Sequence, residues 1–178
     1  GALLPVQQSD PRQWTHAAHA ADLRQALGGA CDDLLNVVES VPTWTLWSLH
    51  DREPLQRAAQ QAQGRVALLG DAAHPMLPYL AQGAAMAIED AWTLGRLLRS
   101  DVPANERVID WPVVFARYAP TRWQRNARVQ RMSRRNGTLF HAQGALRCAR
   151  NLPMGLLGER LLDNTWLYDG PPEPEAAP

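Results

Sequence analysis

The 178-residue chain has 46% hydrophobic and 20% charged residues, a composition typical of a globular domain with a substantial core. Eighteen basic and eighteen acidic side chains cancel to a formal net charge of +0, so no overall charge attracts the molecule to nucleic acid or anionic lipid. Every basic residue is Arg, and the lack of Lys excludes a P-loop and any enzyme that forms a Schiff base through Lys.

The cysteine content indicates a reducing compartment, and the hydropathy pattern predicts no membrane-spanning helix. Cys31 and Cys148 are far apart and form no CxxC pair, which argues against a disulfide scaffold and against a thiolate zinc site. No stretch approaches the ~20 apolar residues of a membrane-spanning helix, and residues 1–10 lack the pattern of a signal peptide. We therefore expect a cytoplasmic protein that does not bind membranes.

The first fifty residues predict two helices followed by a strand. The helices are expected over 15–27 and 32–39, where acidic residues at the start of the second suit the helix dipole. Residues 43–49 (TWTLWSL) are rich in Thr and Trp and alternate in part, which is typical of a strand. The alternation slips at Leu46, as a β-bulge would cause.

The middle of the chain predicts a buried strand, a loop and a long helix. Residues 65–69 (RVALL) form an apolar run that predicts a strand buried on both faces, as in a parallel sheet. After a loop with two prolines, a helix is expected from Gly83 to Arg99. One stripe of this helix consists mostly of small residues, which favours close packing there, and it comprises Ala84, Ile88, Ala91, Gly95 and Leu98.

The remainder predicts further helices and an extended tail. Four helices are expected, over 110–118, 120–135, 139–150 and 156–162, with Pro120 at the first position of the second. Residues 170–178 are rich in Pro and acidic, so we expect a flexible tail.

The strongest functional signal lies in the strand, loop and helix of the middle segment. Asp71 follows the predicted strand, where α/β sheets bind ligands, and its carboxylate can accept hydrogen bonds from ligand hydroxyls. A helix that begins at Gly83 directs free backbone N–H groups and a partial positive charge toward its ligand. These features suit an electron-rich ligand with hydroxyl groups, although an ordinary strand-to-helix crossover carries them too.

Residues 64–91 (GRVALLGDAAHPMLPYLAQGAAMAIEDA) resemble, almost position for position, the second flavin-binding motif of the FAD-dependent aromatic hydroxylases. Within it, residues 78–85 (PYLAQGAA), with Ala81 where many members carry Gly, are similar to the salicylate hydroxylase branch. Residues 47–54 (WSLHDREP) and 128–136 (RVQRMSRRN) also resemble that branch. The resemblance is sharpest in the first of these segments.

The resemblance implies an FAD site. Asp71, after Gly70, would hydrogen-bond the ribityl chain, and Pro78 would be the catalytic loop residue beside the flavin ring, where oxygen adds at C4a. The start of the long helix would face the pyrimidine edge of the ring, where reduced flavin carries negative charge that a helix N-terminus stabilises. The helix residues assigned to the cofactor are Gln82, Gly83, Ala84 and Ala85.

The reaction that the resemblance implies is hydroxylation of a phenolic aromatic acid similar to salicylate. In this family NAD(P)H reduces the flavin, O2 forms a flavin C4a-hydroperoxide, and its terminal oxygen is transferred to the substrate ring. The family also carries an N-terminal GxGxxG motif, which is absent here. We therefore expect a C-terminal portion that is inactive alone, with the missing N-terminal part as its partner, a homodimer as a further assembly, and no metal or nucleic acid.

The expected fold class is α/β, an α+β fragment that is mostly helical with a few strands, from the C-terminal part of an FAD-binding hydroxylase fold. Four parts follow from the resemblance. They are the end of the substrate-binding domain (1–58), the closing part of the FAD-binding domain (59–103), C-terminal helices (104–169) and the tail (170–178).

Six arginines recur about three residues apart in the arginine-rich helical segment 121–135. As an alternative function, the chain would be a non-catalytic helical module that binds a partner or nucleic acid through this arginine stripe. The zero net charge favours a solvated or salt-bridged face instead. The stripe comprises Arg122, Arg125, Arg128, Arg131, Arg134 and Arg135.

Three other groups of polar residues have simple structural interpretations. His16 and His19 are three residues apart, but no third metal ligand accompanies them. His74 is expected to fix its loop rather than to act as an acid or base, because no proton partner is evident. Glu89 and Asp90 are adjacent on a helix, so their side chains diverge and are not expected to share a proton.

Overall fold

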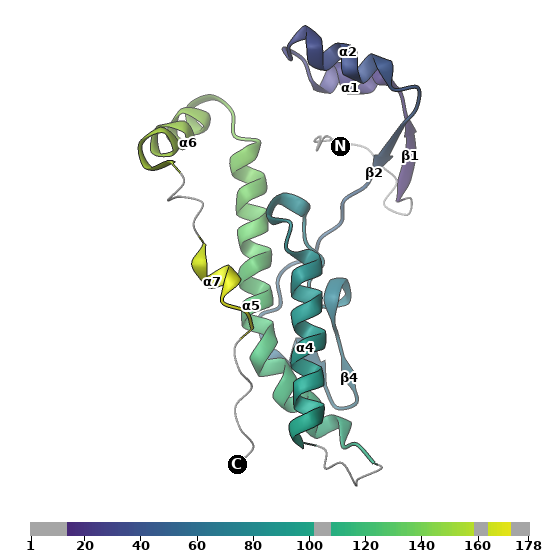
Figure 1. The fold of residues 1–178 in the computed structure, drawn as a ribbon, viewed down its shortest axis with the longest axis vertical. Helices are drawn as coiled ribbons and strands as arrows, with labels where there is room; N and C mark the ends of the chain where they lie inside the picture. The colour runs from purple at the N-terminus through teal and green to yellow at the C-terminus, as the bar shows by residue number, and fades with distance from the viewer. Residues whose placement is uncertain (1–13, 102–107, 159–163, 172–178) are drawn as a thin grey trace. The chain divides into compact units, whose positions relative to one another are not determined.

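The computed structural model describes residues 14–101, 108–158 and 164–171. It is mostly helical with a few short strands, which confirms the expected fold class, and it divides into two compact units, Gly1–Leu49 and His50–Pro178 (Figure 1). Nearly all of the predicted tail, and most of the helix predicted over 156–162, lie outside the described residues.

The first unit is a two-stranded sheet whose strands are joined by two helices. β1 (Thr15–Ala18) pairs antiparallel with β2 (Trp44–Trp47), and α1 (Ala20–Ala26) and α2 (Asp32–Ser40) lie between them in the chain. The prediction of a helix from residue 15 is wrong for its first turn, because those backbone groups bond to β2. The strands pair residue for residue, so the bulge expected at Leu46 is absent.

The second unit begins with a short helix and a hairpin. α3 (Ala58–Gln61) leads into β3 (Ala62–Gln63), which pairs antiparallel with β4 (Val66–Ala67) around Gly64. The φ of Gly64 is +57°, a backbone conformation that favours glycine and folds the chain back at this point. The prediction of a strand buried in a parallel sheet is therefore wrong for the described residues: β4 pairs only with β3, and Val66 is 65% exposed.

Two long helices form the centre of the second unit. α4 (Gly83–Asp101) confirms the predicted long helix, and it lies along α5 (Trp111–Phe140), as Figure 1 shows. α6 (Gly144–Leu157) starts five residues later than expected, because α5 continues to residue 140. The short α7 (Thr165–Tyr168) packs on α5 and has no counterpart in the sequence prediction.

α5 runs without interruption through Pro120, where the sequence predicts a boundary between two helices. A proline inside a helix removes one backbone hydrogen bond and costs about 3 kcal/mol. The residues on both sides of it, Tyr118, Ala119 and Arg122, are buried against the rest of the unit. Because this packing is available only to a continuous helix, it outweighs the local cost.

The face of α4 that packs on α5 differs from the predicted stripe of small residues. Met86, Asp90, Thr93 and Leu97 are the buried positions, whereas the small-residue stripe is exposed in its first half and Ile88 is 69% exposed. Apolar contacts at the two ends of the interface enclose a polar centre. The buried apolar residues form one cluster of Met86, Val129 and Leu167 and another of Leu97, Val114 and Tyr118.

The buried face of α5 is polar over about three turns. Arg122, Asn126, Gln130 and Ser133 recur at the spacing of one helix face, and none is more than 1% exposed. Gly137 is the next residue on that face, and the ring of Tyr79 lies against it. A Cβ at this position would lie 2.6 Å from Cε2 and 2.7 Å from Cδ2 of Tyr79.

We expect Gly137→Ala to lower the free energy of unfolding by about 1–3 kcal/mol, because the added methyl group forces Tyr79 out of its packed position. The matched control is Gly155→Ala in α6, where a Cβ meets no atom within 4 Å. There, the higher helix propensity of Ala should raise stability by up to about 1 kcal/mol. Urea unfolding of both variants checks this, and equal gains in stability would contradict the packing role of Gly137.

Candidate functional site

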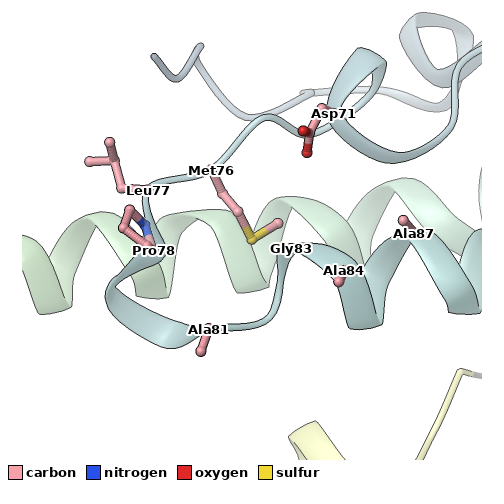
Figure 2. A pocket seen from close by; sticks show the side chains of 8 residues that line it. All are labelled: Asp71, Met76, Leu77, Pro78, Ala81, Gly83, Ala84 and Ala87. Atoms are coloured by element: carbon pink, nitrogen blue, oxygen red, sulfur yellow. The ribbon is translucent and has the colours of Figure 1, made fainter. Parts of the chain in front are cut away.

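An open pocket of about 510 Å³ lies where the proline loop meets the start of α4 (Figure 2). Four residues that the sequence assigns to the cofactor site line it, namely Asp71, Pro78, Gly83 and Ala84. Met76, Leu77, Ala81 and Ala87 complete a lining that is apolar apart from the Asp71 carboxylate and the backbone.

The other three predicted residues lie close to the pocket without lining it. Gly70 has a φ of +53°, and a Cβ there would lie 3.3 Å from Cβ of Ala87, so glycine lets the loop approach α4 closely. The carbonyl of Gln82 accepts a hydrogen bond from the Met86 N–H at 3.0 Å. Ala85 packs against the apolar cluster that contains Met86.

Among the described residues, no acceptor bonds to the first N–H groups of α4, whose start lines the pocket. The Met86 N–H bonds back to Gln82, so the N–H groups of Gly83, Ala84 and Ala85 precede the first helical hydrogen bond. No acidic residue in the first turn offsets the positive end of the helix dipole. This end of the pocket therefore favours a ligand with negative charge or hydrogen-bond acceptors.

Asp71 supplies the opposite chemistry on the same pocket. It lies in a 3₁₀ turn (Gly70–Ala72), and Figure 2 shows its carboxylate on the far side of the pocket from the lining residues Ala81 and Ala84. Asp71 is exposed, and within the described part of the chain its carboxylate has no hydrogen-bond or ion-pair partner. It can therefore accept hydrogen bonds from ligand hydroxyl groups.

Ala81 adopts a strained conformation between the loop and α4. It follows the 3₁₀ turn Pro78–Leu80 with φ +53° and ψ +31°, in the left-handed region that glycine tolerates best. It is the one non-glycine residue with positive φ among the described residues. The turn and Ala81 connect Pro78 to the start of α4. Ala81 also lines the pocket.

The Asp90 carboxylate of α4 binds both α5 and the segment that precedes the proline loop. Its Oδ1 accepts hydrogen bonds from Arg122 Nε at 2.8 Å and Asn126 Nδ2 at 3.0 Å. Its Oδ2 accepts one from the Gly70 N–H at 3.1 Å and lies 2.7 Å from His74 Nε2. The side chains of Asp90, His74 and Arg122 are fully buried.

Burial alone would raise the pKa of Asp90, but hydrogen bonds from His74, Asn126 and Arg122, with the charge of Arg122, lower it below its usual value. The carboxylate is therefore ionised and accepts hydrogen bonds only, so His74 Nε2 carries the proton in their contact. His74 is fully buried and does not line the pocket. This agrees with the expectation that His74 fixes the loop, and it identifies the missing partner as Asp90.

Glu89 completes the network at the edge of the interface. Its carboxylate pairs with Arg122 Nη1 at 2.7 Å and with Arg125 Nε at 2.7 Å. Arg125 also donates to the carbonyls of Trp166 and Leu167 in α7, both at 2.9 Å. Burial would raise the pKa of Glu89, but hydrogen bonds from Arg125 and Arg122 lower it. Glu89 and Asp90 thus share Arg122 rather than a proton.

The arginine stripe is largely a salt-bridged face, as expected, although Arg122 is buried rather than solvated. Arg122, Arg125 and Arg134 are paired with carboxylates of this chain, and Arg128 stacks 3.7 Å from the Trp166 ring centre. Sequence reasoning missed this network because it takes apolar residues as the mark of a buried face. The available signal was the helical spacing of Arg122 and Asn126.

Histidine, cysteine and acidic side chains are dispersed over the described part of the chain. No cluster of three or more His, Cys, Asp or Glu side chains there could hold a metal ion. Both cysteines, Cys31 and Cys148, are free and exposed. None of the described helices combines the length and the hydropathy that crossing a bilayer requires.

A carboxylate and a helix N-terminus on one pocket define a site for a ligand that has both hydroxyl donors and an electron-rich edge. The family model described as "FAD binding domain" matches residues 4–110, so the chain belongs to this FAD-binding family. This match confirms FAD as the cofactor of the family, and together with the relatives below it confirms the resemblance to FAD-dependent aromatic hydroxylases.

Among curated relatives, the chain is 40% identical over 169 residues to 3-hydroxybenzoate 6-hydroxylase of Polaromonas naphthalenivorans (strain CJ2), covering 93% of this chain and 40% of that protein. It is similar to the solved structure of a salicylate hydroxylase substrate complex, with a TM-score of 0.71, 32% identity, and coverage of 93% of this chain and 38% of that one.

A second solved structure is Klebsiella pneumoniae HpxO complexed with FAD and uric acid, with a TM-score of 0.67 and 26% identity. The match covers 85% of this chain and 38% of that one. The chain therefore spans about 40% of the length of these three relatives.

We expect stability to fall as the pH drops below about 4, where unfolded carboxyl groups become protonated. The folded pKa values of Asp90 and Glu89 are lowered, so their contribution is complete above the unfolded pKa and is lost as the pH falls through the folded pKa. Urea unfolding from pH 7 to pH 2 measures this loss. Glu89→Gln should reduce the loss of unfolding free energy between pH 7 and pH 2, and an unchanged loss in this variant would rule out the contribution of Glu89.

We expect Ala81→Gly to raise the free energy of unfolding by about 0.5–1 kcal/mol, because glycine adopts the left-handed conformation without strain. Ala91→Gly is the matched control, since Ala91 is exposed in the middle of α4. There, the lower helix propensity of glycine should reduce stability by about 1 kcal/mol. Thermal and urea unfolding distinguish the two cases, and a loss in both variants would show that Ala81 is not strained.

Proposed function

We propose that this chain is the C-terminal portion of an FAD-dependent monooxygenase that hydroxylates a phenolic aromatic acid. The observation that carries the proposal is that the Asp71 carboxylate and the N-terminus of α4 face one pocket. The substrates in the names of two relatives, 3-hydroxybenzoate and salicylate, are both phenolic acids, and they support this substrate class.

The residues of the pocket fit FAD. The ribityl chain carries hydroxyl groups that can donate to a carboxylate, and Asp71 has no competing partner among the described residues. The pyrimidine edge of the flavin ring carries hydrogen-bond acceptors, which suit the free N–H groups of Gly83, Ala84 and Ala85. The remaining lining, including Met76, is apolar and suits a flat aromatic ring.

When bound, FAD supplies the redox chemistry and the activation of O2, with NAD(P)H as the proposed electron donor. Asp71 holds the ribityl hydroxyls and so fixes the cofactor along the pocket. The first N–H groups of α4, from Gly83 to Ala85, stabilise negative charge at the pyrimidine edge. Pro78 has no N–H and shapes the reaction space with its ring and carbonyl, which excludes water from this wall.

The domain assignment forms part of the proposal. Residues 1–58 would close the substrate-binding domain and 59–103 the FAD-binding domain, with C-terminal helices over 104–169 and a flexible tail over 170–178. The proposed partners are the N-terminal part of the protein, a small aromatic substrate, O2 and a second copy in a homodimer, in the cytoplasm. The alternative of a nucleic-acid-binding module has less support, because three arginines of the stripe pair within this chain.

The test is Asp71→Asn in the complete protein that contains this chain. Asn keeps an acceptor oxygen but loses the charge that makes such a hydrogen bond about twice as strong as a neutral one, so the dissociation constant of FAD should rise by about tenfold. Asp169→Asn is the control, because Asp169 is exposed and does not line the pocket. Flavin fluorescence titration measures the affinity, and hydroxylated product is assayed in parallel. Unchanged FAD affinity in Asp71→Asn would remove Asp71 from the cofactor site.

A further inference from the structure

Three side chains of α5 hold the loop that forms one wall of the pocket. Gln130 Nε2 donates to the Pro75 carbonyl at 2.7 Å, Ser133 Oγ donates to the Leu77 carbonyl, and Asn136 Nδ2 donates to the Tyr79 carbonyl at 3.2 Å. The donors recur every three residues on α5, and the acceptors recur every two residues along the loop. We call Gln130, Ser133 and Asn136 the positioning ladder.

The sequence of the loop explains why side chains make these bonds. Pro75 and Pro78 have no backbone N–H to donate, so the segment that leads into the turn Pro78–Leu80 cannot pair as a regular strand or helix. Its carbonyls still need donors where water is excluded, and Gln130 and Ser133 are almost fully buried. The polar face of α5 supplies the donors that the loop lacks.

The ladder also holds the segment that precedes the loop. Gln130 Nε2 donates to the Arg52 carbonyl at 2.6 Å, and the Arg52 guanidinium donates to the carbonyls of Ala72, at 2.8 Å, and Ala73. Arg134 pairs with Asp51 in the same segment. α5 thus bonds the loop directly at Pro75, Leu77 and Tyr79, and it also bonds the segment whose Arg52 side chain holds Ala72 and Ala73.

We infer that the positioning ladder sets the place of Pro78 relative to the N-terminus of α4, and so sets the width of the pocket for the flavin ring. Gln130, Ser133 and Asn136 do not line the pocket, whereas Leu77 and Pro78 do. The three residues of the ladder are therefore positioning residues that act through the loop backbone. This inference rests on the proposed function for the identity of the ligand, and on the hydrogen bonds alone for the position of the loop.

The test uses the complete protein with Ser133→Ala and, as a second variant, Gln130→Met, which keeps the side-chain length but removes the donor. Thr138→Ala is the matched control, because the Thr138 hydroxyl is on the same helix and bonds to the helix backbone at Arg134. Hydrogen exchange of the peptide over 74–82 is measured by mass spectrometry without added FAD. The absorption spectrum of bound flavin and the product formed per NAD(P)H oxidised are then measured.

A buried carbonyl that loses its donor destabilises the bonded conformation of the loop. Hydrogen exchange over 74–82 should therefore rise about tenfold in Ser133→Ala and Gln130→Met. The flavin spectrum should shift and the yield of product per NAD(P)H should fall, while Thr138→Ala behaves as the unmodified protein. Should either variant not fold, Asn136→Asp removes a donor from a half-buried position without changing its size.

Loop exchange equal to that of Thr138→Ala would overturn the inference, as would increased exchange with an unchanged flavin spectrum. If the unmodified protein binds no FAD, the proposed function fails. The exchange measurement, which needs no cofactor, then still decides whether the ladder positions the loop.

Discussion

The structure of the second unit depends on the buried carboxylate of Asp90. Removing a charge from water costs several kcal/mol, and a buried carboxylate persists only when charges and hydrogen bonds compensate it. Asp90 receives this compensation from Arg122 and Asn126 on α5, and from His74 and Gly70 in the segment before the pocket. Loss of any one donor therefore affects the contact between the helices and the loop together.

This arrangement makes α5 the element on which the functional segments assemble. Its polar face bonds residues 51–53, the proline loop and α4, and Arg125 also holds α7. The three segments with family resemblance, 47–54, 64–91 and 128–136, are separate in sequence but are joined by these bonds. Hydrogen bonds, unlike apolar contacts, require particular donors at particular positions, which gives a physical reason why the three patterns occur together.

The sequence predicts the elements whose signals are local. α2, β2 and α4 follow from caps, alternation and periodicity, and the motif over 64–91 predicts which residues meet at the pocket, among them Asp71 and Gly83. The sequence does not predict the continuity of α5 through Pro120, because burial on both sides of the proline decides it. The same limit applies to β1, whose pairing with a strand almost thirty residues later overrides its local preference for helix.

The polar network was the largest part of the site that sequence reasoning missed. Arginine, asparagine, glutamine and serine at helical spacing are typical of an exposed face, and only the three-dimensional contact between α4 and α5 shows that this face is buried. Similarly, the adjacency of Glu89 and Asp90 argues against a shared proton, but it does not predict that both carboxylates bind Arg122, which lies more than thirty residues away.

The proposed function requires that Asp71 and the start of α4 bind FAD from opposite sides of one pocket. The most direct measurement is a crystal structure of the complete protein with FAD bound. We expect the Asp71 carboxylate within hydrogen-bond distance of a ribityl hydroxyl, and the N–H groups of Gly83 to Ala85 facing the pyrimidine edge of the ring. A flavin bound elsewhere, with Asp71 in contact with solvent alone, would contradict it.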